Sequence, residues 1–220
     1  MFRFKLKPRE IIILFAPLLF LVLCLIPQGE DPWMVSLPEL FSRPRENARR
    51  SSCQSNLKGM GMGIKMYCAD YDGRYPLEIS PAVGWDNLIM PYTKSCPITQ
   101  CPSETTAPFM GPGRGVGAGC PSDYWINARL NDAAGVGRNE RMLPIPSNTI
   151  LMGDGDGTKG TPNYALDDTS WNAKQPYALR HLKGANYSFC DGHVKWFLAR
   201  DVDKTKSLAP SKGAPTFLIR

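Results

Sequence analysis

Residues 180–197, "RHLKGANYSFCDGHVKWF", decide how the C-terminal half of this chain folds. Two alternating runs, 185–190 and 193–198, flank the dipeptide Asp191-Gly192, a strong short-range signal for a β-hairpin. A two-residue type I′ turn at that dipeptide needs positive φ at both central positions. The sequence therefore predicts a hairpin, and folding alone accounts for Asp191 and for His193, which follows the turn.

The same stretch collects two histidines, a cysteine and an aspartate, which are residue types of many catalytic sites. His181 stands before the first strand, where it could close a hydrogen bond onto the hairpin or reach a ligand. A cysteine hydrolase could pair His181 with Cys101 or Cys190, but no pattern in the sequence aligns a nucleophile, a base and an orienting acid. We therefore expect structural roles for His181 and His193 and no catalytic residue.

Upstream of the hairpin, residues 45–71 have the spacing of an amphipathic helix. Glycines at positions 59, 61 and 63 each weaken a helix by about 1 kcal/mol against alanine, so this helix needs close tertiary packing. The Asp72-Gly73 turn ends it. Apolar side chains at three- and four-residue intervals form the predicted buried stripe: Leu57, Met60, Ile64, Tyr67 and Tyr71.

Short strand-like runs follow the helix at 124–127 and 148–153, and glycine-rich stretches separate the strands. Strands and helices do not alternate, so a doubly wound parallel sheet is excluded. The sequence predicts an α+β fold, with a small antiparallel β-sheet and long loops at residues 72–200 and a C-terminal tail at 201–220.

An unbroken apolar run, "IIILFAPLLFLVLCLI" at residues 11–26, is able to enter a bilayer. At about 1.5 Å per residue it covers about 24 Å of a hydrocarbon core near 30 Å, and no Ala-x-Ala-like cleavage pattern follows it. Basic residues precede it, which favours a cytoplasmic N-terminus. We expect a cytoplasmic segment at 1–10, a transmembrane helix at 11–27 and a Pro-rich linker at 28–44, with the next helix beginning just after Pro44.

The formal net charge of +6 is less informative than its distribution. Residues 1–10 carry a net +3, which belongs to membrane orientation. Arginines at positions 43, 45, 49 and 50 could touch nucleic-acid phosphates, but beside a membrane they are more typical of contacts with lipid headgroups. We expect no nucleic-acid partner, and a nucleic-acid binder remains a rival interpretation.

Six of the seven cysteines lie beyond the apolar run, an even number that suits an oxidising compartment. Structural zinc is disfavoured, because the nearest pair, Cys96 and Cys101, has four residues between its members. Cys53 and Cys68 cannot pair with each other, since about 22 Å separates them in a continuous helix. We expect disulfides from the loop cysteines, with partners that the sequence does not assign: Cys96, Cys101 and Cys120.

A glycine-rich stretch, "GDGDGTKG" at residues 153–160, places Asp154 and Asp156 at alternate positions. Hard oxygen ligands on a flexible turn suit calcium, although no glutamate stands at the twelfth position of an EF-hand-like loop. An ordinary turn is the alternative. No cofactor is required, and calcium is the one ion that this loop suggests.

The spacing from His181 to Asp191-Gly192, with nine residues between, followed by "HVKW", resembles the C-terminal signature of bacterial prepilin-type proteins related to type IV pilins and type II secretion pseudopilins. Residues 46–76 are similar to that family's helix and turn after the membrane segment, and "PSNTILMGD" at 146–154 to one of its strands. Two further segments match its motifs in the same order, "CPSE" with Cys101, Pro102 and Ser103, and "YWIN" with Tyr124 and Asn127.

The resemblance implies a type IV pilin-like fold, in which an N-terminal membrane helix and an amphipathic helix pack on the antiparallel sheet. It covers about three quarters of the chain. One departure concerns processing: nothing between Met1 and Ile11 matches the Gly-Phe-Thr-Leu-x-Glu-like peptidase site of such prepilins. If Glu10 played the part of the family's glutamate, the residue before the cut would be Lys5 instead of glycine.

From this resemblance we expect a membrane-anchored, pseudopilin-like structural or assembly protein that is not an enzyme. It would cross the inner (cytoplasmic) membrane once, with its N-terminus inside and its domain extracytoplasmic. Its partners would be the lipid bilayer and other pilin-like or secretion-system subunits. The alternative is a membrane-anchored ligand-binding module for calcium or an envelope glycan, which exposed aromatic side chains would favour: Tyr75, Trp85, Trp125 and Trp171.

Overall fold

The computed structural model describes residues 37–76, 84–104, 122–131, 137–156, 165–209 and 214–219, with side chains from residue 42 onward. Contacts divide the chain into Met1–Ser42 and Arg43–Arg220, and the second unit is the subject below. The predicted cytoplasmic segment and transmembrane helix lie outside the described residues. Within the described part of the chain, no helix is both long and apolar enough to cross a bilayer.

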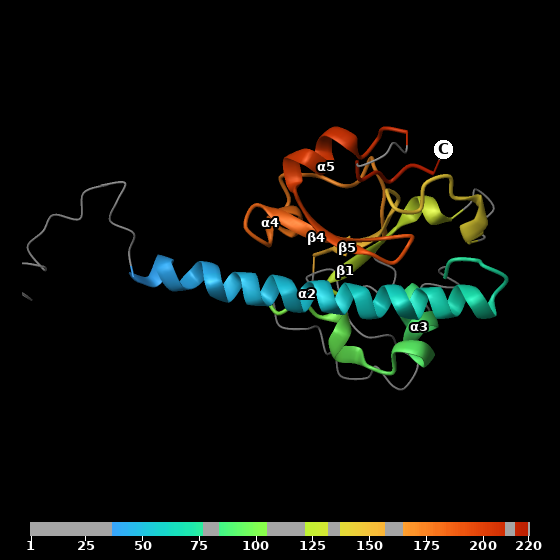
Figure 1. Cartoon of the computed structure of the whole chain (residues 1–220), viewed down its shortest axis with the longest axis horizontal. Helices are drawn as coiled ribbons and strands as arrows, with labels where there is room; N and C mark the ends of the chain where they lie inside the picture. Colours follow the sequence, from blue (N-terminus) through green and yellow to red (C-terminus); the bar gives the residue numbers. More distant parts are fainter. Residues whose placement is uncertain are drawn as a thin grey trace, which may run out of the picture. The chain divides into compact units, whose positions relative to one another are not determined.

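The helix expected at residues 45–71 is α2 (Leu37–Asp70), which begins earlier than the sequence predicted (Figure 1). Pro44 lies inside this helix, so the expected linker at 28–44 overlaps it. Proline removes one N–H donor, but its fixed φ near −65° is itself helical, and a long helix can continue through it. At the other end, Asp72 and Gly73 take positive φ, and the Gly73 N–H donates to the Cys68 carbonyl at 2.7 Å, which closes the helix as predicted.

One face of α2 is buried against the sheet. Tyr71, which the periodicity assigned to this face, is exposed and stacks on Tyr67, because the helix ends before it. α3 (Trp85–Thr93) packs beside α2, and a Cβ on Gly63 would lie 2.7 Å from Thr93 Cγ2. Close packing at a helix glycine is thus confirmed for Gly63. The fully buried stripe of α2 is Cys53, Leu57, Met60, Ile64 and Cys68.

The sheet has five strands in the order β3-β1-β2-β4-β5, and it is mixed. The strands are β1 (Tyr124–Asn127), β2 (Ile150–Asp154), β3 (Ala165–Leu166), β4 (Gly184–Phe189) and β5 (Val194–Leu198). All neighbours are antiparallel except β1 and β3, so the expectation of an antiparallel sheet was wrong for that pair. β2 runs against β1, and one further reversal of the chain brings β3 back parallel to β1.

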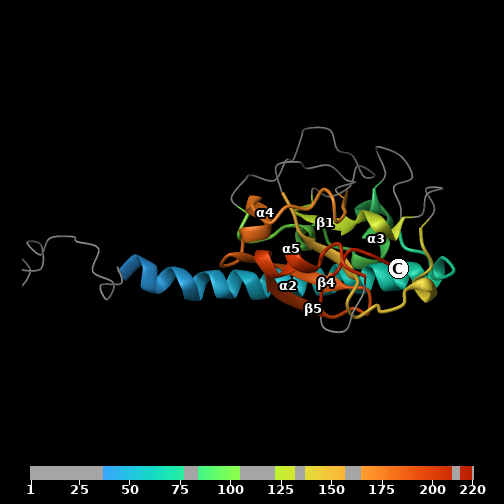
Figure 2. The same cartoon turned by 90° about the horizontal axis from the view of Figure 1, so that it is seen from above.

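Both faces of the sheet are covered. The α2 stripe packs with Tyr124, Ile126, Met152 and Cys190 on one face. On the other face, Trp125, Tyr187 and Phe189 pack with two short helices, α4 (Pro176–Leu179) and α5 (Ala199–Thr205). Figure 1 shows α5 on the opposite side of β4 and β5 from α2, and in the view from above these strands overlie α2 (Figure 2). Because both faces are buried, β4 is solvent-excluded along its whole length.

The hairpin of β4 and β5 forms with a different turn from the one predicted. Gly192 has φ of +94°, whereas Asp191 does not take a positive φ, so the type I′ turn is wrong. The Gly192 N–H donates to the Phe189 carbonyl at 2.8 Å, and the Phe189 N–H to the His193 carbonyl at 2.9 Å. The three-residue loop 190–192 with a left-handed glycine last is the turn followed by a G1 bulge that commonly closes hairpins.

The C-terminal residues join the domain instead of forming the expected tail. α5 follows β5 directly, and residues 214–219 return to the sheet. Thr149 and Thr216 form a parallel bridge, and Phe217 is fully buried against Trp125 at a ring-centroid distance of 5.2 Å. Among the described residues, three short 3-10 helices lie in the connections: Cys96–Thr99, Ala128–Leu130 and Glu140–Met142.

Candidate functional site

His181 lies at the centre of a buried polar cluster between α2 and the sheet, and its side chain is fully excluded from solvent. A tight loop holds it there. The His181 N–H donates to the Gly184 carbonyl at 2.8 Å, and the intervening residues Leu182 and Lys183 take positive φ. The indole N–H of Trp196 on β5 donates to the His181 carbonyl at 2.8 Å. The hairpin thus fixes the backbone of the histidine before any side-chain contact is considered.

One ring nitrogen of His181 faces α2. Nδ1 lies 2.6 Å from Glu46 Oε1, and since a carboxylate can only accept here, Nδ1 carries the proton. The Ser103 hydroxyl donates to the same carboxylate, at 2.9 Å from Oε1 and 3.1 Å from Oε2. Glu46 therefore joins the N-terminal part of α2 to the histidine and to the segment after Cys101.

The other ring nitrogen faces the sheet and a disulfide. Nε2 lies 3.3 Å from Asp154 Oδ2 and 3.5 Å from Cys101 Sγ. Asp154 is the last residue of β2, and its Oδ2 accepts the Asn186 backbone N–H at 2.7 Å. Its second oxygen, Oδ1, is buried without a hydrogen-bond partner among the described residues.

A disulfide joins Cys53 of α2 to Cys101, with a Cα–Cα distance of 5.4 Å across a sequence separation of 48. The Cys101 N–H donates to Asp123 Oδ2 at 2.7 Å. Arg180, next to the histidine, pairs with Glu104 and donates to the carbonyl of Gly155. Covalent, ionic and hydrogen bonds therefore connect α2, the segment at 101–104 and the sheet at one place. We call this place the His181 joint, and it consists of Glu46, Cys53, Cys101, Asp154 and His181.

The electrostatics of this joint favour a charged histidine. Burial lowers the pKa of His181, but the hydrogen bond and charge of Asp154, followed by those of Glu46, outweigh burial and hold the pKa above its usual 6.5. An imidazolium offsets one of the two carboxylate charges, and hydrogen bonds from the Ser103 hydroxyl to Glu46 and from the Asn186 N–H to Asp154 help to stabilise the remaining negative charge. The cluster is thus suited to holding the two layers together. With one sulfur from each cysteine, His181 Nε2 and an Asp154 oxygen within 4.8 Å of one another, it also contains four atoms of metal-ligating type.

The other residues of the resemblance motifs stabilise nearby backbone. Asp191 accepts from the His193 N–H at 3.0 Å, and the Gly192 carbonyl accepts from Lys58 Nζ of α2 at 2.7 Å. Asn127 donates to the carbonyls of Ile150 and Phe217, at 2.7 and 3.1 Å. Tyr124 is buried, with its hydroxyl 3.4 Å from Asn56 Nδ2 of α2, whereas Pro102 is exposed.

Asp154, which we paired with Asp156 as a candidate calcium ligand, is the last residue of β2. Its carboxylate is buried against His181, and the calcium site stays a prediction. Asp156 is half-buried at the edge of the described residues. Two glycines flank Asp154 in the sequence, and for that reason we expected it to lie in a loop.

The cysteines divide into two kinds. Cys101 is disulfide-bonded to Cys53, and Cys96 is disulfide-bonded too, while Cys120 lies outside the described residues. Cys68 and Cys190 are free and buried, and burial raises the pKa of each thiol to about 12. Of the two cysteines that the hydrolase interpretation considered, Cys101 has its sulfur in the disulfide, and burial holds Cys190 as a neutral thiol at neutral pH.

The aromatic side chains that would have favoured a ligand-binding module are core residues. Tyr75, Trp85, Trp125 and Trp171 are each at most 2% exposed. In the arginine cluster, Arg43, Arg45 and Arg49 are exposed, whereas Arg50 is half-buried and lies 5.4 Å over the Trp196 ring. The buried aromatic side chains therefore do not favour the ligand-binding interpretation, and the absence of a nucleic-acid partner stays a prediction.

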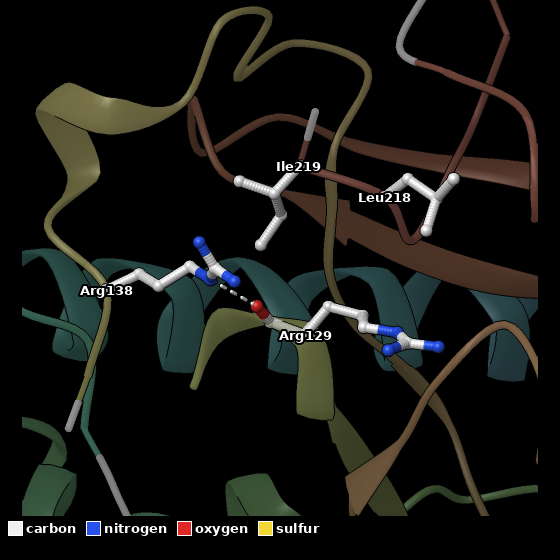
Figure 3. A pocket seen from close by; sticks show the side chains of 4 residues that line it. All are labelled: Arg129, Arg138, Leu218 and Ile219. Carbon is white, nitrogen blue, oxygen red and sulfur yellow. Dashed lines mark hydrogen bonds between the residues drawn. The ribbon is translucent and has the colours of Figure 1, made fainter. Parts of the chain in front are cut away.

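A hollow of about 320 Å³ lies at the C-terminal segment, lined by Arg129, Arg138, Leu218 and Ile219 (Figure 3). The Ile219 side chain points toward the Arg138 guanidinium, whose Nε donates to the Arg129 carbonyl at 3.0 Å. Arg129 is engaged by Asp168 at 2.8 Å. The hollow is thus basic and partly apolar, but one of its two cations is already paired.

Sequence reasoning missed Glu46, the role of Asp154, and the partner of Cys101. A signal for Glu46 was present, because positions 46, 50, 53 and 57 share one face of a helix, and Glu46 is therefore a charge on the buried stripe. No comparable signal pointed to Cys53, whose partner lies 48 residues away.

Residues 42–141 match the model of the family SBP_bac_10, described as "Protein of unknown function (DUF1559)". That family is associated with pilin-like and type II secretion pseudopilin-like proteins. The match covers α2 from residue 42 onward, the disulfide and β1, and it ends before His181, so it covers a little less than half of the chain. No curated protein and no solved structure matches the chain.

Proposed function

We propose that this chain is a membrane-anchored, pilin-like surface protein whose extracytoplasmic domain serves packing and assembly and does not turn over a substrate. The observation that carries the proposal is the buried joint around His181. The motif residues His181, Cys101 and Ser103 fix α2 to the sheet through the disulfide and Glu46. A long helix tied so firmly to its domain suits a protein that is displayed or assembled through that helix.

Three further observations support the proposal. The family match at residues 42–141 points to a pilin-like surface protein. Disulfides at Cys53 and Cys96 agree with an oxidising compartment. The apolar run at 11–26, preceded by basic residues, has the composition of an anchor with its N-terminus inside.

Fractionation of bacteria that express the full chain tests the anchor and the side on which the domain lies. We expect the protein to stay in the membrane pellet after alkaline carbonate washing, and protease added outside spheroplasts to digest its domain. The matched control is a variant that lacks residues 1–27, which should leave the pellet. Recovery of the full chain in the soluble fraction, or protection of the domain from external protease, would contradict the proposal.

The intact mass of the membrane-extracted protein distinguishes two modes of assembly. A mass equal to that of all 220 residues would indicate an uncleaved anchor and an accessory or display role. A shortened, N-methylated chain would indicate prepilin processing and a filament subunit. A mass that corresponds to cleavage near residue 27, without an added methyl group, would contradict both modes of assembly.

A further inference from the structure

Four side chains at the His181 joint match the ligand set of a zinc site. They supply two cysteine sulfurs, one imidazole nitrogen and one carboxylate oxygen, and these atoms lie within 4.8 Å of one another. All four residues are buried. Cysteine, histidine and aspartate are the residues that bind zinc in four-coordinate sites. In the oxidised protein the two sulfurs are bonded to each other, so they are not yet ligands.

The distances already approach those of a tetrahedral site. Zinc binds sulfur at about 2.3 Å and nitrogen or oxygen at about 2.0–2.2 Å, so neighbouring ligand atoms in a tetrahedron stand about 3.3–3.8 Å apart. His181 Nε2 lies 3.5 Å from Cys101 Sγ and 3.3 Å from Asp154 Oδ2. Two edges of the tetrahedron therefore exist, and the main change needed is separation of the two sulfurs.

The surroundings orient these ligands as metal sites require. The Glu46 carboxylate holds His181 Nδ1–H at 2.6 Å, which leaves Nε2 directed at the cluster. This carboxylate–histidine arrangement is the usual support of a metal-bound imidazole. Asp154 supplies the second indication. Its Oδ2 forms the edge described above, and the other oxygen of the same carboxylate, Oδ1, is buried without a partner in the described structure, so a metal bound to this carboxylate would also satisfy Oδ1.

We propose that, once the Cys53–Cys101 disulfide is reduced, Cys53, Cys101, His181 and Asp154 bind one zinc ion. The metal then ties α2 to the sheet in place of the disulfide. This inference goes beyond the proposed surface role and does not depend on it. Calcium is not the ion that this site suits, since half of its ligand atoms are sulfur.

The chemistry balances with a dithiol as the reductant. Two electrons and two protons from the dithiol convert the disulfide to two thiols, and the dithiol becomes a cyclic disulfide. When the metal binds, each thiol releases its proton to solvent and donates a thiolate electron pair. His181 contributes the lone pair of Nε2 after any proton there has been released to solvent, and keeps the proton on Nδ1 against Glu46.

Cobalt titration of the full chain tests the proposal, because Co²⁺ replaces zinc and is coloured. The protein is reduced with a dithiol, freed of the reductant under nitrogen and titrated with Co²⁺. We expect one Co²⁺ per chain, with the visible bands of a tetrahedral site and a sulfur-to-cobalt charge-transfer band that Zn²⁺ abolishes. Oxidised protein should show neither band.

Substitutions locate the site. Cys53→Ser and Cys101→Ser should each remove the charge-transfer band or weaken binding by about a hundredfold or more, and Glu46→Gln should weaken it by about 10- to 100-fold. The matched controls are Cys68→Ser, a buried free thiol on the same helix, and Cys96→Ser, which removes a cysteine of a different disulfide. Both controls should bind as the unsubstituted protein does.

A measurement without substitutions covers the case in which variants do not fold. Reduced wild-type protein is alkylated with and without Zn²⁺, and the modified cysteines are identified by mass spectrometry. We expect zinc to slow modification of Cys53 and Cys101 at least about tenfold and to leave Cys96 unchanged. Equal modification of Cys53 and Cys101 in the two samples, or Co²⁺ binding by Cys53→Ser that is as tight as in the unsubstituted protein, would overturn the proposal.

Discussion

Two histidines in this chain touch a carboxylate at the same distance but in opposite environments. Nδ1 of His181 lies 2.6 Å from Glu46, and Nδ1 of His193 lies 2.6 Å from Asp191. The first side chain is fully buried, and the second is 42% exposed. Water screens an exposed pair, whereas a buried charge that loses its partner has no solvent to replace it. The contact should therefore contribute more to the free energy of unfolding at His181 than at His193.

Replacement of each histidine by glutamine measures that difference. We expect His181→Gln to lower the free energy of unfolding by about 3–5 kcal/mol, because Asp154 is left buried without its ion-pair partner and Glu46 keeps only Arg49, at 3.9 Å, as an oppositely charged contact. His193→Gln should lower it by at most about 1 kcal/mol. Urea denaturation of the oxidised protein gives both values, and equal losses for the two variants would refute a structural role for the buried histidine.

The Asp167 carboxyl should make the stability of the fold depend on pH in the acidic range. Partial burial raises its pKa, but hydrogen bonds from Ser170 and Thr169 and the charge of Arg129 outweigh burial and lower the pKa to about 2. A carboxyl whose pKa is lower in the folded protein stabilises the fold above its unfolded value of 3.8. That contribution is lost as the pH falls through 3.8 toward about 2.

Comparison with Asp167→Asn isolates this effect. Unfolding free energies measured by denaturation at several pH values from about 5 down to about 2 should decline less steeply in the variant than in the unsubstituted protein. Asp203→Asn is a suitable control, since Asp203 has a more exposed side chain and one ion pair, with Lys206. An unchanged slope in Asp167→Asn would show that the turn at 167–170 does not depend on the charge.

The place of His181 before the hairpin could be predicted from sequence, but its partners could not. That place favoured a structural function, and the buried contacts with Glu46 and Asp154 support this interpretation. Glu46 and Cys101 lie 135 and 80 residues away along the chain, and no local pattern connects positions so distant. Asp154 was assigned to a glycine-rich turn for the same reason. The sequence shows the glycines next to it, but it does not show the residues that it contacts in the fold.

At the scale of elements, the helix and the hairpin were predictable and their ends were not. The three- and four-residue spacing of Leu57, Met60 and Ile64 fixed the buried face of α2, and these residues are fully buried. Its start was placed too late because Pro44 was interpreted as a boundary. The parallel pairing of β3 with β1 was missed because β3 has only two residues, too few to show a period.

Glycines two positions apart on α2 should respond in opposite directions to alanine. A Cβ at Gly61 meets nothing within 4 Å, so Gly61→Ala should raise the free energy of unfolding by up to about 1 kcal/mol through helix propensity. A Cβ at Gly63 would lie 2.7 Å from Thr93 Cγ2, and this overpacking should make Gly63→Ala destabilising by about 1 kcal/mol or more. Thermal denaturation compares the stabilities of the two variants. Stabilisation by Gly63→Ala would mean that α3 can shift away from α2 at little cost in free energy.

At the scale of the whole domain, burial of both faces of the sheet was not evident from the sequence. Alternation in residues 185–190 indicated one apolar face, yet Asn186 and Ser188 on the other face are also buried, beneath α2. Residues 214–219 add Phe217 to the second core, although the sequence suggested a tail there. Short C-terminal segments that pack on a distant strand carry no periodic signal of their own.

The Cys53–Cys101 disulfide should be a principal source of stability for this domain. A bridge across 48 residues is worth about 4 kcal/mol by the chain-entropy relation. We expect the double variant Cys53→Ala/Cys101→Ala, studied with a metal chelator, to lose about that amount in urea denaturation. Cys68→Ala/Cys190→Ala removes two buried thiols and no bridge, and should lose less. Similar losses in the two variants would show that burial of the sulfur, and not the cross-link, is what matters.

The same disulfide determines which parts of the chain would be extended by a mechanical force. Tension applied to α2 on the N-terminal side of Glu46, and resisted at the C-terminal end of the sheet, passes from Cys53 to Cys101 through the covalent bond. Residues 54–100, with the stripe from Leu57 to Ile64, lie within the closed loop and are shielded from stretching. Under such tension the helix residues of the core would not be extended, and stretching would be limited to the residues before Cys53 and after Cys101, which include the strands that pack on α2.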